Sequence, residues 1–457
     1  MFVLVKRTNI GDIVLMSRII SSDLLAAKLD EAMSASVRDL TARDARIPLV
    51  PGKAIAVIGV RRGGKTSFMR RRMAERIAAG RPREGQLLIG LEDERLIGMT
   101  AADLGWLISE HQRRLAVRTE RIPRSLYLDE VQVVAGWPTL VRRLLDEDDS
   151  EIFVSGSSAK LLSREVATSL RGRGMEVLIH PFSFRESLRH VGAEPASPWE
   201  QLRPMERGEL EVRLRGYLEC GGFPEAHGLE RRDRLALLTS YVDVMVLRDV
   251  IERHAVSNPT SLRWLQRQLL ATPAGSFSVK KLYDSLRSQG VSVSKDTLHA
   301  YLEHLEDAFI VRTISLHSTS ERQRMVNPRK VYPVDPGLVA LYERTGREHR
   351  GRTLETAVLL ELERRGWRVD WYRTGEGWEV DFFAQRPGGS PSLLQVSLDT
   401  SASETWDREV RALASAAAEQ PGAEATLLTL DGSPPTRELP PGVRWRSAAD
   451  WMLEEWG

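Results

Sequence analysis

The stretch from Ala54 to Ser67 constrains the fold of this chain more than any other part of the sequence. A short apolar run over residues 54–58 predicts a buried strand. The pattern GxxxxGKT follows from Gly59 to Thr66, and a helix-forming run without glycine or proline continues over residues 67–79. Strand, glycine-bearing loop and helix in this order are typical of a P-loop, so the sequence predicts a nucleoside triphosphate site.

The residues of this loop are suited to hold phosphates and a magnesium ion. Backbone amides can approach an anion closely at a helix N-terminus, where the helix dipole favours negative charge. We expect Lys65 to reach the β- and γ-phosphates and Thr66 to hold Mg²⁺. A glycine-rich turn without a ligand is the alternative, and the agreement of strand, spacing, lysine and threonine disfavours it. The predicted nucleotide-binding residues are Gly59, Arg62, Gly63, Gly64, Lys65, Thr66 and Ser67.

Two carboxylates end the strand that we expect over residues 125–129. Asp129 is placed to ligate Mg²⁺ directly or through water, and Glu130 to act as general base on the attacking water. An acidic pair at a strand end is often only a turn or a helix cap. The P-loop upstream favours the catalytic interpretation. Further strands over 86–91 and 151–155 would complete a four-stranded sheet around this site.

Two polar segments after residue 154 are further candidates for catalysis. Ser155 and Ser157 could both orient water or the γ-phosphate, and Ser157 is our choice, with a serine-rich helix cap as the alternative. Arg171 and Arg173 lie on a glycine-bearing turn. An arginine finger of this kind can enter a neighbouring subunit's nucleotide site and stabilise charge on the transferred phosphoryl group. A solvated loop is the alternative.

Helical segments flank the expected nucleotide domain. Helical spacing over residues 17–45 predicts a helix that packs on this domain, and a mostly helical block over 216–255 would cap the nucleotide. Arg248 and Asp249 in that block form either an ion pair or a nucleotide sensor, and the sequence leaves both open.

Residues 259–345 show the order of a winged helix. Helices are expected over 262–270, 279–286 and 294–305, and a polar loop joins two strands over 308–316 and 330–334. Winged helices also serve as protein-contact modules, so the order alone does not fix DNA binding. The residues expected to contact DNA are Lys295, Thr297 and His299 on the third helix and Arg322, Arg324 and Arg329 in the loop.

The last part of the chain, 350–457, reads as a separate α/β unit. A helix with Glu355, strands over 367–372, 378–383 and 393–398, and a helix near 404–418 follow the order of a metal-dependent nuclease core. Glu355, Asp381 and Gln395 occupy the positions of its site. Such a core needs an acid and a lysine to bind metal and activate water. Gln395 replaces the acid and Ser397 the lysine, and no lysine follows Lys330. The sequence thus predicts a nuclease-like fold without nuclease chemistry.

Composition sets limits on partners and location. The 457 residues carry a net charge of +2, so DNA binding has to come from local basic patches. A single cysteine, Cys220, fits a reducing compartment. No apolar run is long enough to cross a bilayer, and the start lacks the order of a signal peptide. We expect a cytoplasmic protein without a membrane partner.

The motifs together resemble those of a known family. The motifs are GVRRGGKT at 59–66, LYLDEVQ at 126–132, SGSSA at 155–159, LRGR at 170–173, PFSFRE at 181–186, GGFPE at 221–225, EVD at 379–381 and LQVS at 394–397. This set is similar to prokaryotic AAA+ ATPases that carry a C-terminal domain of uncharacterised function with a restriction-endonuclease-like core. More distantly, the chain resembles replication-initiator ATPases and the bacterial motor that migrates Holliday junctions.

The resemblance implies an α/β fold in five parts. These are an N-terminal extension and helix (1–45), an AAA+ nucleotide-binding domain with a parallel sheet (46–190), a helical lid (191–257), a winged-helix domain (258–347) and a nuclease-like domain (348–457). It also implies ATP and Mg²⁺ as cofactors, and Arg171 or Arg173 as a finger. The expected function is that of an oligomeric ATPase, a hexamer, that moves or remodels duplex or branched DNA. A nucleotide-gated signalling or defence switch is one alternative, and an ATP-dependent nuclease is another.

Overall fold

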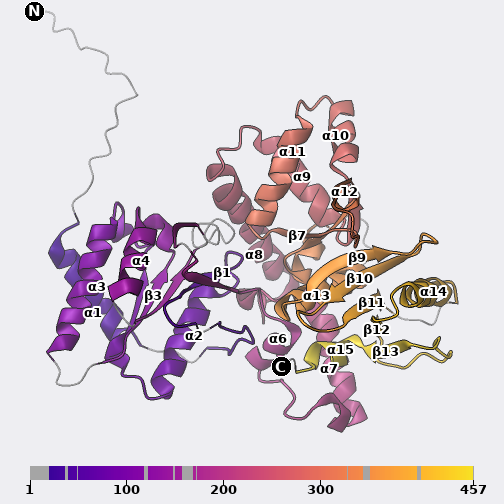
Figure 1. Cartoon of the computed structure of the whole chain (residues 1–457), viewed down its shortest axis with the longest axis horizontal. Helices are drawn as coiled ribbons and strands as arrows, with labels where there is room; N and C mark the ends of the chain where they lie inside the picture. Colours follow the sequence, from indigo (N-terminus) through magenta and orange to yellow (C-terminus); the bar gives the residue numbers. More distant parts are fainter. Residues whose placement is uncertain are drawn as a thin grey trace, which may run out of the picture.

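The chain, seen as a computed structural model, forms an N-terminal α/β part, a central mostly helical part and a C-terminal α/β part (Figure 1). In the described part of the chain, no helix has both the length and the apolar surface that crossing a bilayer requires. The described residues are 20–36, 40–48, 50–117, 122–147, 150–156, 168–170, 172–326, 328–342, 350–398 and 403–455.

A five-stranded parallel sheet forms the centre of the N-terminal part, with strand order β2-β3-β4-β1-β5. Its strands are β1 (Ala54–Ile58), β2 (Gln86–Gly90), β3 (Ser125–Asp129), β4 (Glu151–Ser155) and β5 (Gly174–Leu178). The four strands expected from apolar runs are confirmed. The sequence did not predict β5, because the charged Glu176 interrupts its apolar pattern at the sheet edge.

Helices cover both faces of this sheet. They are α1 (Ser22–Ser34), α2 (Lys65–Ala78), α3 (Ala101–Ala116) and α4 (Trp137–Glu147). Because side chains alternate along a strand, each sheet has two apolar faces to bury. Apolar residues of α1, α3 and α4 share one core with one face, and Phe68, Met69 and Met73 of α2 share another core with the opposite face. The helix expected over 17–45 is shorter in the described residues, beginning after the N-cap Ser21.

The central part contains two bundles of elements in sequence. The first comprises α6 (Phe184–His190), α7 (Pro204–Cys220), α8 (Arg231–Val244) and the π-helix η6 (Met245–Glu252), which continues α8. The second comprises α9 (Pro259–Ala271), β6 (Gly275–Phe277), α10 (Val279–Ser288), α11 (Lys295–Asp307), β7 (Val311–Ile314), α12 (Glu321–Val326), β8 (Arg329–Pro333) and the 3₁₀ helix η7 (Pro336–Leu341). Strands β6, β8 and β7 form an antiparallel sheet in that order.

The prediction of a polar loop between the last two strands is wrong in part. Residues Glu321–Val326 form the short helix α12, since Ser320 precedes it and its side chain accepts the amide of Gln323. The third helix is confirmed, with Ser294 capping α11 through the amide of Thr297 at 3.0 Å. Strand β6 was not expected because three residues carry no readable period.

A mixed five-stranded sheet forms the C-terminal part, with order β13-β12-β11-β10-β9. Strands β9, β10 and β11 are antiparallel neighbours, and β11, β12 and β13 are parallel neighbours. Helices α13 and α14 contribute to separate apolar cores on the two faces. The elements are α13 (Arg350–Arg364), β9 (Arg368–Arg373), β10 (Glu379–Gln385), β11 (Pro391–Ser397), α14 (Ser403–Glu419), β12 (Glu424–Thr429), β13 (Val443–Ser447) and α15 (Ala448–Leu453).

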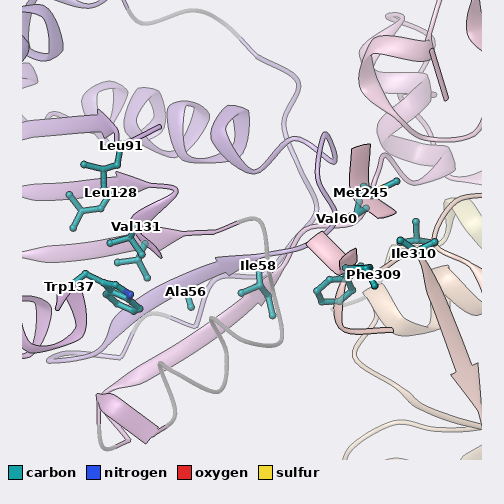
Figure 2. Close-up of a cluster of buried hydrophobic side chains, with 14 of the residues drawn as sticks. Ala56, Ile58, Val60, Leu91, Leu128, Val131, Trp137, Met245, Phe309 and Ile310 are labelled. Atoms are coloured by element: carbon teal, nitrogen blue, oxygen red, sulfur yellow. The ribbon is translucent and has the colours of Figure 1, made fainter. Parts of the chain in front are cut away.

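One apolar core runs without a break from the nucleotide domain into the central part. Val60 of the glycine-bearing loop, Met245 of η6, and Phe309 and Ile310 before β7 are all fully or almost fully buried in it. Figure 2 shows Val60 beside Met245, with Phe309 and Ile310 close by. Close-packed side chains transmit small displacements, so a shift of this loop is felt in η6 and near β7.

Candidate nucleotide-binding site

The loop after β1 has the backbone geometry that a phosphate cradle needs. Gly59 has φ 146°, and a Cβ there would lie 2.1 Å from the Ile179 carbonyl oxygen, so no other residue fits. Gly64, at φ 101°, leads directly into α2, which begins at Lys65. Arg62 also adopts a left-handed conformation, with φ 65°. A non-glycine residue in this region stores strain, which is typical of functional loops.

Lys65 lies inside the loop. Its Nζ donates to the carbonyl oxygens of Gly59 and Val60, at 3.1 Å each, and its side chain is buried. Burial lowers the pKa of Lys65, against the raising effect of Glu130 and Asp129. A cation held this way is available to an anion that enters the loop.

A chain of short contacts connects α2, β3 and β4. Thr66 Oγ1 donates to Asp129 Oδ2 at 2.7 Å, and the Ser155 hydroxyl donates to the other carboxylate oxygen. Burial raises the pKa of Asp129, although the hydrogen bonds from Ser155 and Thr66 oppose this. A hydroxyl and a carboxylate at the P-loop are the oxygen ligands that Mg²⁺ takes in such sites, so the donor set fits this ion.

Glu130 follows Asp129 in a constrained position. Its φ is 57°, its amide donates to Ser155 Oγ at 3.1 Å, and its carboxylate accepts from Gln132 Nε2 at 2.6 Å. Burial raises the pKa of the nearby Glu92, and Glu130 raises it further. Ser155 therefore fixes both acidic residues at once, a role that the preference for Ser157 overlooked.

Arginines brace the loop from outside. Arg43 Nη1 donates to the Gly63 carbonyl at 3.2 Å, and Arg43 Nε pairs with the buried Glu186 at 3.0 Å. Arg61 pairs with Asp249 of η6, and Arg62 Nη1 lies 3.4 Å from Glu225. Arg43 was missed because it was assigned to the helix expected over 17–45, and no local pattern marks a residue that acts across the fold.

The remaining predicted catalytic residues are placed differently. Ser67 is exposed on the first turn of α2. Ser157 and Arg171 lie outside the described residues. The Arg173 carbonyl accepts the amide of Ala54 at 2.9 Å, so Arg173 lies beside the start of β1, whereas the phosphate loop follows the end of β1. Four residue steps of about 3.3 Å separate these positions, so Arg173 could serve only another subunit's site.

The acidic cluster of the C-terminal part contains a lysine from an earlier part of the chain. Lys330 of β8 places its Nζ 3.3 Å from Glu355, 2.9 Å from Glu379 and 3.2 Å from Asp381. The unit itself contains no lysine, as the sequence shows, but β8 supplies one from outside the unit, which the sequence did not predict. Gln395 Nε2 donates to Asp381 Oδ2 at 3.0 Å.

That cluster is mostly buried and already holds a cation, the Lys330 ammonium. The Lys330 side chain is 4% exposed, whereas its partner Glu379 is 40% exposed. Burial, with a contribution from Asp381, raises the pKa of Glu355 to about 8. Within the described residues, no three His, Cys, Asp or Glu side chains are grouped in a way that could hold a metal ion.

The residues predicted to contact DNA divide into exposed and paired groups. Lys295, His299 and Arg322 are exposed, and Thr297 is half-buried. Arg324 lies 3.5 Å from Asp370, and Arg329 lies 3.9 Å from Glu306.

Comparison with known proteins agrees with this geometry. Residues 51–188 match the model of a family described as an AAA domain, and residues 211–348 match a domain of unknown function (DUF8612). The uncharacterized protein MJ1544 of Methanocaldococcus jannaschii is 31% identical over 399 residues, which cover 86% of this chain and 85% of the archaeal protein. The chain belongs to the family of this archaeal protein. This chain carries an AAA-type P-loop NTPase domain, which supports nucleotide binding.

Two further similarities extend across other organisms. An uncharacterized protein of Haemophilus influenzae is 29% identical over 332 residues, covering 72% of this chain and 79% of that protein. Among solved structures, the Walker-type ATPase PABY2304 of Pyrococcus abyssi is similar with a TM-score of 0.41 and 16% identity. The match covers 71% of this chain and 96% of that protein.

Proposed function

We propose that this protein binds and hydrolyses ATP and works as an oligomeric motor or remodeller on duplex or branched DNA. The observation that carries the ATPase part is the contact of Thr66 with Asp129, beside Lys65 and Glu130, at one end of the parallel sheet. Thr66 and Asp129 would hold Mg²⁺, which neutralises phosphate charge when bound.

The side chains at this site have distinct tasks. Lys65 turns from the loop carbonyls to the β- and γ-phosphates of ATP. The Glu130 carboxylate, oriented by Gln132, accepts a proton from water as the water oxygen bonds to the γ-phosphorus. The bond from that phosphorus to the bridging oxygen breaks, and ADP leaves with the electron pair.

The test is steady-state ATP hydrolysis by the full chain, alone and with duplex, single-stranded or four-way-junction DNA. Glu130→Gln, which keeps the shape of the side chain and removes its basicity, is the blank. We expect hydrolysis that one DNA form stimulates and that the blank lacks. Hydrolysis by Glu130→Gln at the wild-type rate would refute the assigned base.

Exposed basic residues support the DNA part of the proposal. Lys295 and Arg322 carry charge on α11 and α12 without a carboxylate partner in any contact of the described residues. We expect the double variant Lys295→Glu/Arg322→Glu to bind duplex DNA at least tenfold more weakly and with a smaller salt dependence. The double variant Arg113→Glu/Arg203→Glu, which makes the same charge change at exposed arginines of α3 and before α7, is the matched control. Equal losses in both proteins would point to net charge alone.

A nucleotide-gated switch with protein partners is the second candidate. It is favoured by the two ion pairs, Arg61–Asp249 and Arg62–Glu225, that connect the phosphate loop with the helical lid. A low hydrolysis rate that no DNA form changes would support the switch over the motor.

We do not propose nuclease activity for the C-terminal part. The buried Lys330 ammonium lies against Glu355 and Asp381, the carboxylates that nuclease chemistry would need for metal. Cleavage of supercoiled or branched DNA with Mg²⁺ or Mn²⁺, lost in Asp381→Asn, would overturn this.

A further inference from the structure

Arg61 of the phosphate loop makes a two-point contact with the lid. Its Nε lies 3.1 Å from Asp249 Oδ2, and its Nη2 lies 3.2 Å from Asp249 Oδ1. The Asp249 side chain is 2% exposed in the π-helix η6. Its other cation, Arg253, is more distant at 3.9 Å. A buried carboxylate is costly without a partner, so Arg61 is its main source of stabilisation.

The same pair lies beside the phosphate cradle. Arg61 lowers the pKa of Lys65 and Asp249 raises it, after the larger effects of burial, Glu130 and Asp129. The pKa of Glu92 also responds to both members of the pair. A guanidinium within electrostatic range of these groups is within range of an anion bound among them.

Packing connects the pair with the rest of the central part. Asp249 belongs to η6. Although π-helical turns are rare in proteins, those that occur are often found at functional sites. Met245 of η6 packs in one core with Val60 and Ile310, as Figure 2 shows. Helix α11, which carries Lys295, also contacts η6. A change at Asp249 therefore has a direct route to the surface proposed for DNA.

We propose that Arg61 and Asp249 form a γ-phosphate sensor. The γ-phosphate of ATP draws the Arg61 guanidinium away from Asp249, whereas ADP leaves the pair intact. Asp249 then lacks its main partner, and η6 and the elements packed on it loosen. Arg61 touches the nucleotide and Asp249 is a positioning residue that acts through it. This inference rests on the proposed ATP binding and assigns the step that distinguishes ATP from ADP.

A ligand shifts a two-state equilibrium only to the extent that it binds the two states with different affinity. This rule predicts the direction in which each substitution changes the affinity for AMPPCP. In Asp249→Asn the guanidinium is no longer held by a charge, so the γ-phosphate does not compete for it. We expect AMPPCP to bind about tenfold more tightly and ADP to bind as in wild type. In Arg61→Gln we expect AMPPCP to bind about tenfold more weakly, again without a change for ADP.

Isothermal titration of the full-length protein with ADP and with AMPPCP measures both ratios. Arg248→Gln is the control. Arg248 precedes Asp249 in the same helix, but its side chain is 62% exposed and pairs with Glu252 at 2.9 Å. Hydrogen exchange over 245–252 gives a second measurement. We expect faster exchange with AMPPCP than with ADP in wild type, and exchange that does not differ between the two nucleotides in Asp249→Asn, whose side chain has no charge to leave unpaired.

The outcomes separate this inference from the proposed function. If the wild type binds both nucleotides and the two variants change both affinities equally, the pair only maintains the loop and the sensor is overturned. If the wild type binds neither ADP nor AMPPCP, the proposed ATP binding fails and the sensor fails with it.

Discussion

Ser155 is the residue on which the geometry of the acidic pair depends. Its hydroxyl donates to Asp129 and accepts the Glu130 amide, so one side chain orients both the predicted metal ligand and the predicted base. Ser157 remains a prediction, because it lies outside the described residues.

We expect Ser155→Ala to lower kcat for ATP hydrolysis about tenfold, because a hydrogen bond to a charged group contributes about 1.5–3 kcal/mol. Steady-state hydrolysis at several Mg²⁺ concentrations measures this. Ser125→Ala is the control, a buried serine at the opposite end of the neighbouring strand β3. Unchanged kcat in Ser155→Ala would mean that Thr66 alone positions Asp129.

Lys330 is the residue on which the buried carboxylates of the C-terminal part depend. Removing one member of a buried charge cluster leaves the others uncompensated, which costs about 3–5 kcal/mol. We expect Lys330→Met to lose stability of this order at pH 8 in chemical unfolding. Arg329→Met, at the adjacent exposed position of β8, should lose less than about 1 kcal/mol.

The loss in Lys330→Met should depend on pH. Burial already raises the pKa of Glu355 to about 8, so Glu355 is mostly protonated in acid and adds charge as the pH rises. The Lys330 ammonium then stabilises the cluster most. The loss of unfolding free energy in Lys330→Met should therefore be larger at pH 9 than at pH 6. An equal loss at both pH values would show that the lysine stem, rather than its charge, stabilises the site.

At the scale of elements, the turn from β8 into η7 joins the two bundles of the central part. The buried Asp335 accepts the amides of Gly222 at 2.6 Å and Gly337 at 2.9 Å. Gly221 and Gly222 leave no room for a Cβ beside Asp335 and Phe182. The segment after α7 and the segment after β8 therefore meet through one carboxylate.

Asp335 gives this junction a pH dependence. Burial raises the pKa of Asp335 to about 6, although both amides oppose this, so the native state holds the proton more tightly than the unfolded chain. Its contribution is complete below about pH 4 and is lost as the pH rises through 6. We expect the unfolding free energy of wild type relative to Asp335→Asn to fall by roughly 3 kcal/mol over this window. A flat difference between the proteins would contradict it.

Local patterns predicted most of the elements and the phosphate loop, because both depend on residues that are close together in the sequence. Lys65, Thr66, Asp129 and Glu130 lie together as their motifs required. The contacts that complete the sites come from distant segments, as with Arg43 on Gly63 and Lys330 among the C-terminal carboxylates. The edge strand β5 lacks a clear period. Such features depend on tertiary packing, which spacing along the chain does not encode.

For the whole molecule, the position of Arg173 bears on assembly. It lies beside the start of β1, whereas its own phosphate loop follows the end of that strand. An arginine side chain cannot span this separation. A catalytic Arg173 would therefore act on a neighbouring subunit, and the proposed ring would be required for hydrolysis. The Arg173 side chain pairs with Asp146 in its own chain, an exposed contact that a neighbouring nucleotide could replace.

Mixing two inactive variants tests this arrangement. Lys65→Ala lacks the phosphate contact and keeps both arginines, and Arg171→Ala/Arg173→Ala keeps the phosphate loop and lacks the finger. If the finger acts between subunits, an equal mixture assembled together places intact arginines beside intact loops at about a quarter of the interfaces. We therefore expect hydrolysis at about a quarter of the wild-type rate per subunit, from two proteins that are each inactive. A mixture no more active than its components, in particles that size measurement shows to be mixed rings, would mean that neither arginine acts across an interface.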